Sequence, residues 1–522
     1  MFESLLVIAI VLLLATIVLT VISNRLGISA PIFLVIAGLV ISLMPGIPHL
    51  RLDPDLLFVI LLPPLLYRAA WNTNWNDFWS NRRPISLHGL GLVIATAVGI
   101  AYLSHALIPN FSLAQGFLLG SIVAPPDALA ATSVLQQLKI RQRIVTILEG
   151  ESLINDAASL IVFRFALAAV VSGQFSFWEA SADFLLASCV GISIGCGIAG
   201  LMYLLQRFVP TSPSMDTVLS IAAPYVMYLC AEKADASGIL AVVSGGFVSA
   251  YYASKTLTPQ AKLQIQGVWE TLVFILNGFV FILIGLQLPI IISKLKWIPL
   301  PVAIGFGLAI SVAVVLIRMV WVFPATYLPR LLNPRLRAND PYPGWRAVFL
   351  LGWCGMRGVV TLASALTIPL LLNDQRVFPF RTLIIFIAFT VIIFTLIVQG
   401  LSLPYLTRYL ALNEPDNDEN QLTDLTNRLT DRVLDHLLNH YSENVLTHEM
   451  REQLAQKTLI IQTDTEIVVS ESGTPQQYQQ LKREIITIRR EELARLRRQN
   501  AFSEAIIRQK EFELDLEQIA LS

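Results

Sequence analysis

The stretch Gly150-Glu151-Ser152-Leu153-Ile154-Asn155-Asp156 places two acids, a hydroxyl and an amide inside a long apolar run. A charge at membrane depth costs several kcal/mol unless it is paired or hydrated, so such residues commonly mark a pathway for ions or protons. About twenty residues upstream, Ala124-Pro125-Pro126-Asp127-Ala128 repeats this pattern in a neighbouring apolar segment. The sequence therefore offers two carboxylates, Asp127 and Asp156, to one small site.

Carboxylate, hydroxyl and carbonyl oxygens are the ligands that hard alkali cations prefer. Burial and a neighbouring negative charge favour the protonated form of a carboxyl group, whereas a bound Na⁺ favours the ionised form. A proton and a cation therefore exclude one another at such a site. If the site changes sides of the membrane only when it is occupied, the protein exchanges cations for protons. This is the chemistry of a carrier, and no covalent catalysis is expected.

Helical geometry sorts the polar side chains around Asp156. Ser152 and Asp156 are four residues apart and share one face, while Glu151 and Asn155 share another face, rotated by about 100°. We therefore expect the first face to bind the ion and the second to make structural contacts. A guanidinium at membrane depth must be paired, so we expect Glu151 to pair with Arg318, which stands alone in an apolar segment. The alternative is that Arg318 lies near a helix end and extends to the interface.

Composition places the chain among helical membrane proteins. Its 522 residues are 55% hydrophobic and only 14% charged, with a mean hydropathy of +0.64, which is too apolar for an ordinary soluble protein. The formal net charge is zero, so no nucleic-acid partner is indicated. The four cysteines are isolated and lack metal-binding spacing. We expect no cofactor and no enzymatic activity.

Apolar segments long enough to cross a bilayer recur through the first 410 residues, and we expect about thirteen transmembrane helices. The expected helices are 4–23, 28–44, 54–71, 85–108, 113–135, 143–171, 183–209, 214–231, 236–254, 268–293, 300–328, 345–372 and 380–408. An odd number places the termini on opposite sides of the membrane.

Loop charges favour an outside N-terminus and a cytoplasmic C-terminus. The plasma (inner) membrane is the expected location. Fourteen Lys and Arg residues then lie in short inner loops and six in outer loops. The inner residues are Arg25, Arg68, Arg82, Arg83, Lys139, Arg141, Arg143, Arg207, Lys255, Lys262, Arg330, Arg335, Arg337 and Arg346, and the outer ones are Arg51, Lys233, Lys294, Lys296, Arg376 and Arg381.

Two of the expected helices contain residues that interrupt helices. Pro125-Pro126 removes two backbone donors from the fifth, and three glycines within 352–358 loosen the twelfth. These are corresponding members of two six-helix halves, as expected for inverted repeats whose discontinuous helices cross at the midplane. The alternative is a pair of ordinary kinks. Each break, however, carries an ionisable residue, Asp127 or Arg357, beside the free helix ends.

Four separated motifs give the sequence a family resemblance. They are Leu62-Pro63-Pro64-Leu65-Leu66, Ala124 to Ala128, Gly150 to Asp156 and Gly355-Met356-Arg357-Gly358. In this order they resemble the cation:proton antiporter-1 family, which contains the sodium/proton exchangers and the NhaP-type antiporters. The resemblance covers about the first 410 residues.

The resemblance implies a Na⁺/H⁺ antiporter that serves sodium transport and pH homeostasis. It also implies a homodimer in which transport domains move against a dimerisation domain. It places the cation ligands at Asp127, Asp156 and Ser152, and the supporting residues at Glu151, Arg318, Asn155 and Arg357.

Two positions depart from the family pattern. Many members have Thr-Asp-Pro where this chain has Pro126-Asp127-Ala128, so a threonine hydroxyl is missing and the Pro126 carbonyl is left as a cation ligand. Many also have an acid soon after Leu-Pro-Pro, where this chain continues Tyr67-Arg68-Ala69-Ala70. A carboxylate near the entrance is therefore missing. Na⁺ is the expected substrate, with Li⁺ and K⁺ as alternatives.

Asn155 and Arg357 bear on the stoichiometry of exchange. Antiporters with an Asp at the position of Asn155 have an extra ionisable group, often facing a lysine that can release its proton. Here the amide cannot titrate and the guanidinium does not deprotonate. One proton therefore replaces one cation, and electroneutral exchange is expected.

The segment 411–522 is polar and charged, and we expect a helical, cytosolic regulatory tail that follows a transmembrane antiporter domain of residues 1–410. Two other functions stay open. A carrier for a small anion, passing Arg68 and Arg357, would keep its activity when Asp156 is neutralised. An intramembrane hydrolase would need a nucleophile and a base, and no histidine lies in the central spans to activate Ser152 or Ser159.

Overall fold

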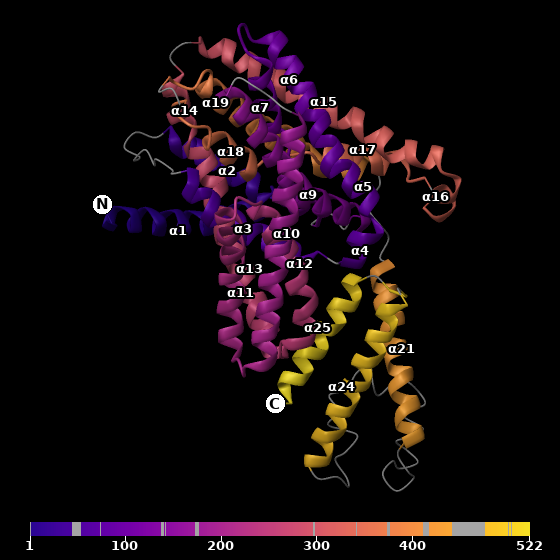
Figure 1. Ribbon diagram of the computed structural model, residues 1–522. Coiled ribbons are helices and arrows are strands. Elements are labelled where there is room, and N and C mark those ends of the chain that lie inside the picture. Colours follow the sequence, from indigo (N-terminus) through magenta and orange to yellow (C-terminus); the bar gives the residue numbers. More distant parts are fainter. Residues whose placement is uncertain are drawn as a thin grey trace. The chain divides into compact units, whose positions relative to one another are not determined.

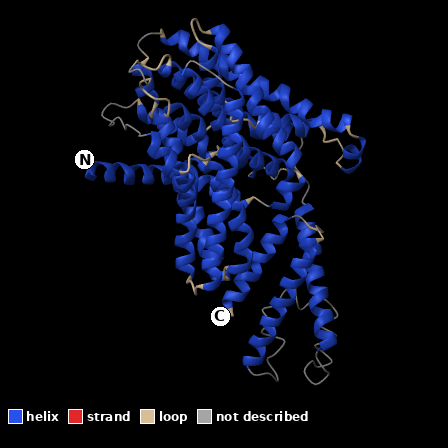
Figure 2. Cartoon of the chain, in the orientation of Figure 1, coloured by secondary structure: helices blue, strands red, loops and turns tan. Residues whose placement is uncertain are grey.

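The computed structural model is all-helical in its regular elements, apart from isolated bridges such as that between Leu371 and Val377 (Figure 2). It describes residues 2–43, 54–73, 75–136, 140, 142–172, 177–295, 298–340, 342–372, 376–410, 417–440, 475–499, 501–502 and 504–521. Arg51, Lys139, Arg141 and Lys296, which contribute to the predicted loop-charge pattern, lie outside these residues.

The chain divides into two compact units, and the first comprises Met1–Thr256 and Ile265–Asn413 (Figure 1). Its helices are α1 (Phe2–Leu26), α2 (Ala30–Ser42), α3 (Pro54–Asn72), α4 (Trp75–Ser80), α5 (Arg82–Ser86), η1 (Leu87–Leu92), α6 (Val93–Leu107), α7 (Leu113–Val123), α8 (Ala128–Gln136), α9 (Gln142–Ser172), α10 (Phe177–Phe208), α11 (Pro213–Lys233), α12 (Gly238–Thr256), most of α13 (Pro259–Leu286), α14 (Leu288–Lys294), α15 (Leu300–Leu332), α16 (Pro334–Asn339), α17 (Trp345–Trp353), α18 (Val359–Leu366), α19 (Arg381–Phe394), η2 (Thr395–Gln399) and α20 (Gly400–Leu410).

Every segment that the sequence predicts to be a membrane helix contains helix in the structure. Among the described residues, seven helical stretches are long and apolar enough to cross a membrane. They are Arg82–Leu107, Arg143–Ser172, Leu185–Phe208, Pro213–Lys233, Pro259–Lys294, Leu300–Leu332 and Arg381–Leu410, and four shorter apolar helices accompany them. The chain is therefore an integral, multi-pass membrane protein.

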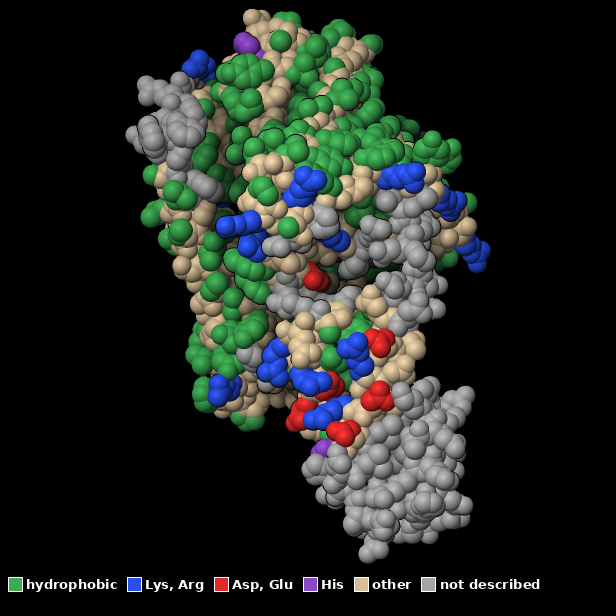
Figure 3. All heavy atoms as spheres, turned by 90° about the vertical axis from the view of Figure 1, so that its right-hand side faces the viewer, with side chains coloured by type: hydrophobic (Ala, Val, Ile, Leu, Met, Phe, Trp, Pro, Cys, Tyr) green, Lys and Arg blue, Asp and Glu red, His purple; other side chains and the backbone are tan. Residues whose placement is uncertain are grey.

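The surface of the first unit carries large exposed hydrophobic side chains. Leu201 on α10, Val320 on α15 and Tyr405 on α20 are 66%, 71% and 76% exposed. Figure 3 shows one face of the molecule with broad areas of hydrophobic side chains. A soluble monomer rarely exposes apolar patches of this extent, and we assign this surface to lipid contact.

The core of the first unit surrounds α19. This helix buries residues on every side, including Ile384, Ile387 and Val391, which are fully inaccessible. A helix that is apolar all round lies inside a packed assembly. It continues through the π-helical turn η2, which lies next to the interruption between α17 and α18 and contributes Thr395 to it.

The second unit comprises Leu257–Gln264 and Glu414–Ser522. Its helices are the first turns of α13, α21 (Asn417–His440), α24 (Pro475–Arg498) and α25 (Glu504–Ala520). Apolar side chains from the three tail helices form a core of their own, and Leu425, Leu493 and Ile507 belong to it. Buried Asp515 on α25 pairs with Arg490 at 2.5 Å and with Lys262 of α13 at 3.9 Å.

Candidate functional site

Two interrupted helices meet in the first unit. Residues 124–127 separate α7 from α8, and residues 354–358 separate α17 from α18. The backbone N–H of Asp127 donates a hydrogen bond of 2.6 Å to the carbonyl of Met356, which joins the two interruptions directly. Free helix ends are therefore concentrated in one place, where they supply partial charges to the site.

The first interruption follows from the local sequence. Ser112 and Gln115 form a capping box that fixes the start of α7, with bonds of 3.2 Å and 2.8 Å between side chain and backbone. Pro125 and Pro126 then lack the N–H groups that would continue the helix. The next N–H belongs to Asp127, which finds its acceptor in the other broken helix.

Arg357 stabilises the carbonyl end of α7. Its fully buried guanidinium donates from Nε to the carbonyl of Val123 at 3.0 Å and from Nη2 to that of Ala124 at 3.4 Å, and it also bonds the carbonyl of Gly355. Its backbone N–H donates to Thr395 Oγ1 at 3.0 Å. A helix C-terminus carries partial negative charge and unpaired carbonyls, so a buried cation is favourable here.

Glu151 and Arg318 form the buried ion pair that the sequence predicts. Arg318 Nη2 lies 3.0 Å from Glu151 Oε2, and Nη1 bonds Oε1, so the contact is bidentate. The guanidinium also donates to the carbonyls of Leu351 and Gly352, at 3.1 Å and 3.2 Å, near the end of α17. Arg318 is fully buried, so it does not extend to the membrane surface as in the alternative interpretation.

Asn155, on the same face of α9 as Glu151, connects this helix to the interruption between α7 and α8. It is fully buried, and its Nδ2 donates a long hydrogen bond of 3.5 Å to the carbonyl of Pro126. That carbonyl keeps a second lone pair for another partner. Asn155 thus holds the carbonyl oxygen of Pro126, which is one of the predicted cation ligands.

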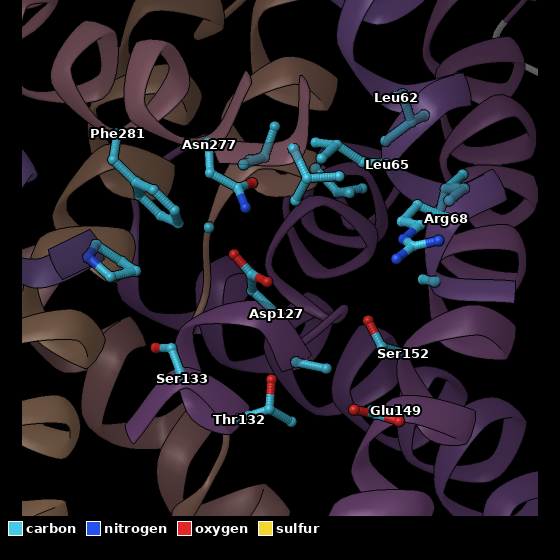
Figure 4. A pocket seen from close by; sticks show the side chains of 18 of the residues that line it. Leu62, Leu65, Arg68, Asp127, Thr132, Ser133, Glu149, Ser152, Asn277 and Phe281 are labelled. Atoms are coloured by element: carbon cyan, nitrogen blue, oxygen red, sulfur yellow. The ribbon is translucent and has the colours of Figure 1, made fainter. Parts of the chain in front are cut away.

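A cavity of about 550 Å³ joins the remaining predicted residues. Pro126, Asp127, Ser152 and Asp156 all line it, and Asp127 lies near its middle in Figure 4. None of the four supporting residues lines this cavity. The two faces of α9 are therefore separated as helical periodicity predicts. One face lies toward the cavity, and the other carries Glu151 and Asn155.

Other polar residues line the cavity besides the predicted cation ligands. Glu149, Glu270 and Asn277 line it. Arg68, counted with the inner-loop charges in the predicted topology, lies in the last turns of α3 and lines it too (Figure 4). Glu149 precedes Ser152 by three residues and Asp156 by seven, so helical spacing alone could have assigned it to the same face. For Arg68, Glu270 and Asn277, only the packing of α3 and α13 reveals the position.

Gly358 keeps the space that the Asp127 carboxylate occupies. A methyl group at Gly358 would collide with Oδ2 of Asp127 and would lie 2.8 Å from its Cγ. We expect Gly358→Ala to displace the carboxylate and to lower the rate of the exchange that the sequence predicts by about a hundredfold, as small misplacements of reacting groups do. Gly305→Ala on α15 is the matched control, since nothing lies within 4 Å of its added carbon. Equal rates in both variants would contradict this geometry.

Two carboxylates, buried Asp156 and half-buried Asp127, line a cavity beside two interrupted membrane helices. This arrangement is typical of one class of protein, the secondary ion carriers. The transmembrane sodium/hydrogen exchanger family model matches residues 10–409. The chain belongs to this family.

Relatives with assigned activities resemble most of the membrane unit. A sodium, potassium, lithium and rubidium/H⁺ antiporter of Bacillus pumilus is 36% identical over 411 residues, which cover 76% of this chain and 61% of the relative. The Na⁺/H⁺ antiporter ApNhaP of Aphanothece halophytica is 30% identical over 387 residues, 73% of this chain and 69% of the relative. The chain thus spans about three fifths of the length of the Bacillus antiporters that it matches.

The fold is also that of a solved antiporter. The sodium proton antiporter MjNhaP1 of Methanocaldococcus jannaschii superimposes with a TM-score of 0.58 at 17% sequence identity. The match covers 78% of this chain and all of that structure. At this identity the likeness concerns the fold alone.

Proposed function

We propose that the protein exchanges a monovalent cation for a proton across the membrane, with Na⁺ as the main substrate and Li⁺ or K⁺ as alternatives. One observation carries this proposal: Asp127 and Asp156 line the same cavity together with Ser152 and Pro126. These are oxygen ligands suited to a hard alkali cation. The family and the named activities of the relatives support the same substrates.

The exchange follows from competition at the two carboxylates. Na⁺ binds when Asp127 and Asp156 are ionised, with Ser152 Oγ and the Pro126 carbonyl completing its shell, and a proton on Asp156 displaces it. Asn155 holds the Pro126 carbonyl, while Arg357 and the Glu151–Arg318 pair hold the carbonyl ends of the broken helices. The ligand geometry is thereby kept while the occupied site changes sides.

The larger architecture is part of the proposal. Thirteen membrane helices in two inverted six-helix repeats, with α7/α8 and α17/α18 as the crossed discontinuous pair, would place the site at the midplane. The N-terminus would lie outside, two copies would form a homodimer, and residues 411–522 would be a cytosolic regulatory tail. The separate core of the tail helices supports a domain of its own.

Stoichiometry gives the test of this function. Purified protein in liposomes with an acidic interior should take up Na⁺ against its gradient, because protons leave in exchange. Since Asn155 cannot titrate and Arg357 stays charged, one Na⁺ should replace one proton with no net charge moved. A membrane potential acts only on net charge, at about 2.3 kcal/mol per charge per 100 mV. Sodium uptake should therefore be the same with and without an imposed potential.

Antiport and its stoichiometry are tested by different measurements. No uptake under the pH gradient, in protein that elutes as a single folded species, would contradict antiport itself. Uptake that rises or falls with the potential, or a steady current on supported membranes, would show that a second proton moves. That result would overturn only the interpretation of Asn155.

A further inference from the structure

Arg68, near the end of α3, places a positive charge in the cavity that Asp127 and Asp156 line. Arg68 and Asn72 are four residues apart, on one face of the last turns of α3, and both line the cavity. Figure 4 shows the Arg68 guanidinium on the same side of the cavity as Ser152 and Glu149. Arg68 is thus part of the cavity that contains the proposed cation ligands.

Acidic residues outnumber Arg68 around this cavity. Among the described lining residues, Arg68 is the only base, and the acids are Asp127, Glu149, Asp156 and Glu270. Such an excess of negative charge raises the local concentration of cations. Glu149 follows the helical register of Ser152 and Asp156, one turn before Ser152. The face of α9 that carries Ser152 and Asp156 therefore also carries the Glu149 carboxylate.

We propose that Arg68 is a tethered positive charge that lowers the affinity of the cavity for the transported cation, and that Glu149 is the opposing carboxylate that raises it. This inference rests on the proposed cation exchange and assigns two determinants of its affinity. A guanidinium remains charged under all physiological conditions. An incoming Na⁺ therefore meets a fixed repulsion that it would not meet if the residue were neutral.

The walls of the cavity make this repulsion effective. Leu62, Leu65 and Phe281 line it alongside the polar groups, and charges interact more strongly next to apolar walls than in bulk water. For two unit charges about 8 Å apart at an effective dielectric of about 20 to 40, Coulomb's law gives about a fivefold to thirtyfold change in affinity. This is the expected size of the effect.

The test is the Na⁺ concentration dependence of proton flux in liposomes containing the full chain, at one alkaline pH. Arg68→Gln should lower the half-saturating Na⁺ concentration about fivefold to thirtyfold, with little change in the maximal rate. Arg68→Lys should keep the wild-type value, because the charge stays. Glu149→Gln should raise the half-saturating concentration. Arg207→Gln is the control, since Arg207 is exposed on α10, bonds Tyr203 and does not line the cavity.

The outcomes separate this inference from the proposed function. An unchanged or raised half-saturating concentration in folded Arg68→Gln, with a wild type that exchanges, would overturn it. Equal shifts in Arg68→Gln and Arg68→Lys would also overturn it, because shape rather than charge would then matter. If Arg68→Gln does not fold, an unchanged value in Glu149→Gln is the contradicting result. A wild type without any exchange would instead refute the proposed function.

Discussion

Asp156→Asn is expected to reduce cation/proton exchange to the level of empty liposomes while the protein remains folded. Asp156 is buried in α9 and faces the cavity with Asp127. The amide keeps the size of the side chain but can neither carry the exchangeable proton nor neutralise a bound cation. Asp127→Asn should have the same effect, because the amide oxygen carries no negative charge and one carboxylate is left to balance the bound cation.

The control for this prediction is an acid outside the cavity. Asp183 is exposed on α10, and Asp183→Asn should exchange at the wild-type rate. Size-exclusion profiles of all variants establish folding. Near-normal exchange by folded Asp156→Asn would remove this residue from the site, and would favour a carrier that uses Arg68 and Arg357 for a small anion.

Arg318→Ala should destabilise the protein by about 3 to 5 kcal/mol, the cost of leaving a buried charge without its partner. The substitution strands Glu151, which is 1% exposed, and also the carbonyls of Leu351 and Gly352. We expect a marked fall in the melting temperature in detergent. Arg164→Ala is the matched control, because its pair with Glu232 lies 2.9 Å apart at the surface and should contribute at most about 1 kcal/mol.

A double-mutant cycle tests whether the destabilisation comes from the pair. Glu151→Gln and Arg318→Met are measured singly and together, and the double variant, which lacks both charges, should recover much of the stability that Arg318→Met alone loses. Strictly additive losses would mean that the two side chains act independently. They would also contradict the role of the pair in holding α17.

Much of the site is predictable because membrane burial limits what polar residues can do. Arg318 had to be paired at depth, and Glu151 was the available carboxylate. The separation of Ser152 from Glu151 on α9 follows from helical periodicity alone. The interruption at Pro125-Pro126 follows from missing backbone donors. In each case one physical rule acts over a short stretch of sequence.

Other features depend on packing between distant segments. The sequence does not indicate that Arg68 of α3 and Glu270 of α13 line one cavity with Asp156, because the helices are joined only in the folded core. The start of α13 at Pro259, nine residues before the predicted start, was missed because hydropathy reports apolar length and its first turns are polar. Nor does the sequence indicate that Arg357 reaches the carbonyl of Val123.

The most direct test of the account is the collapse of an acid-interior pH gradient in liposomes after separate additions of Na⁺, Li⁺ and K⁺. Wild-type protein should release protons on addition of Na⁺, and the extent of release by Li⁺ and K⁺ ranks the alternative substrates. Asp156→Asn, measured in the same preparation, should give no release with any of the three cations. Wild-type protein that ignores all three cations, or Asp156→Asn that responds as wild type does, would contradict cation/proton exchange at the paired carboxylates.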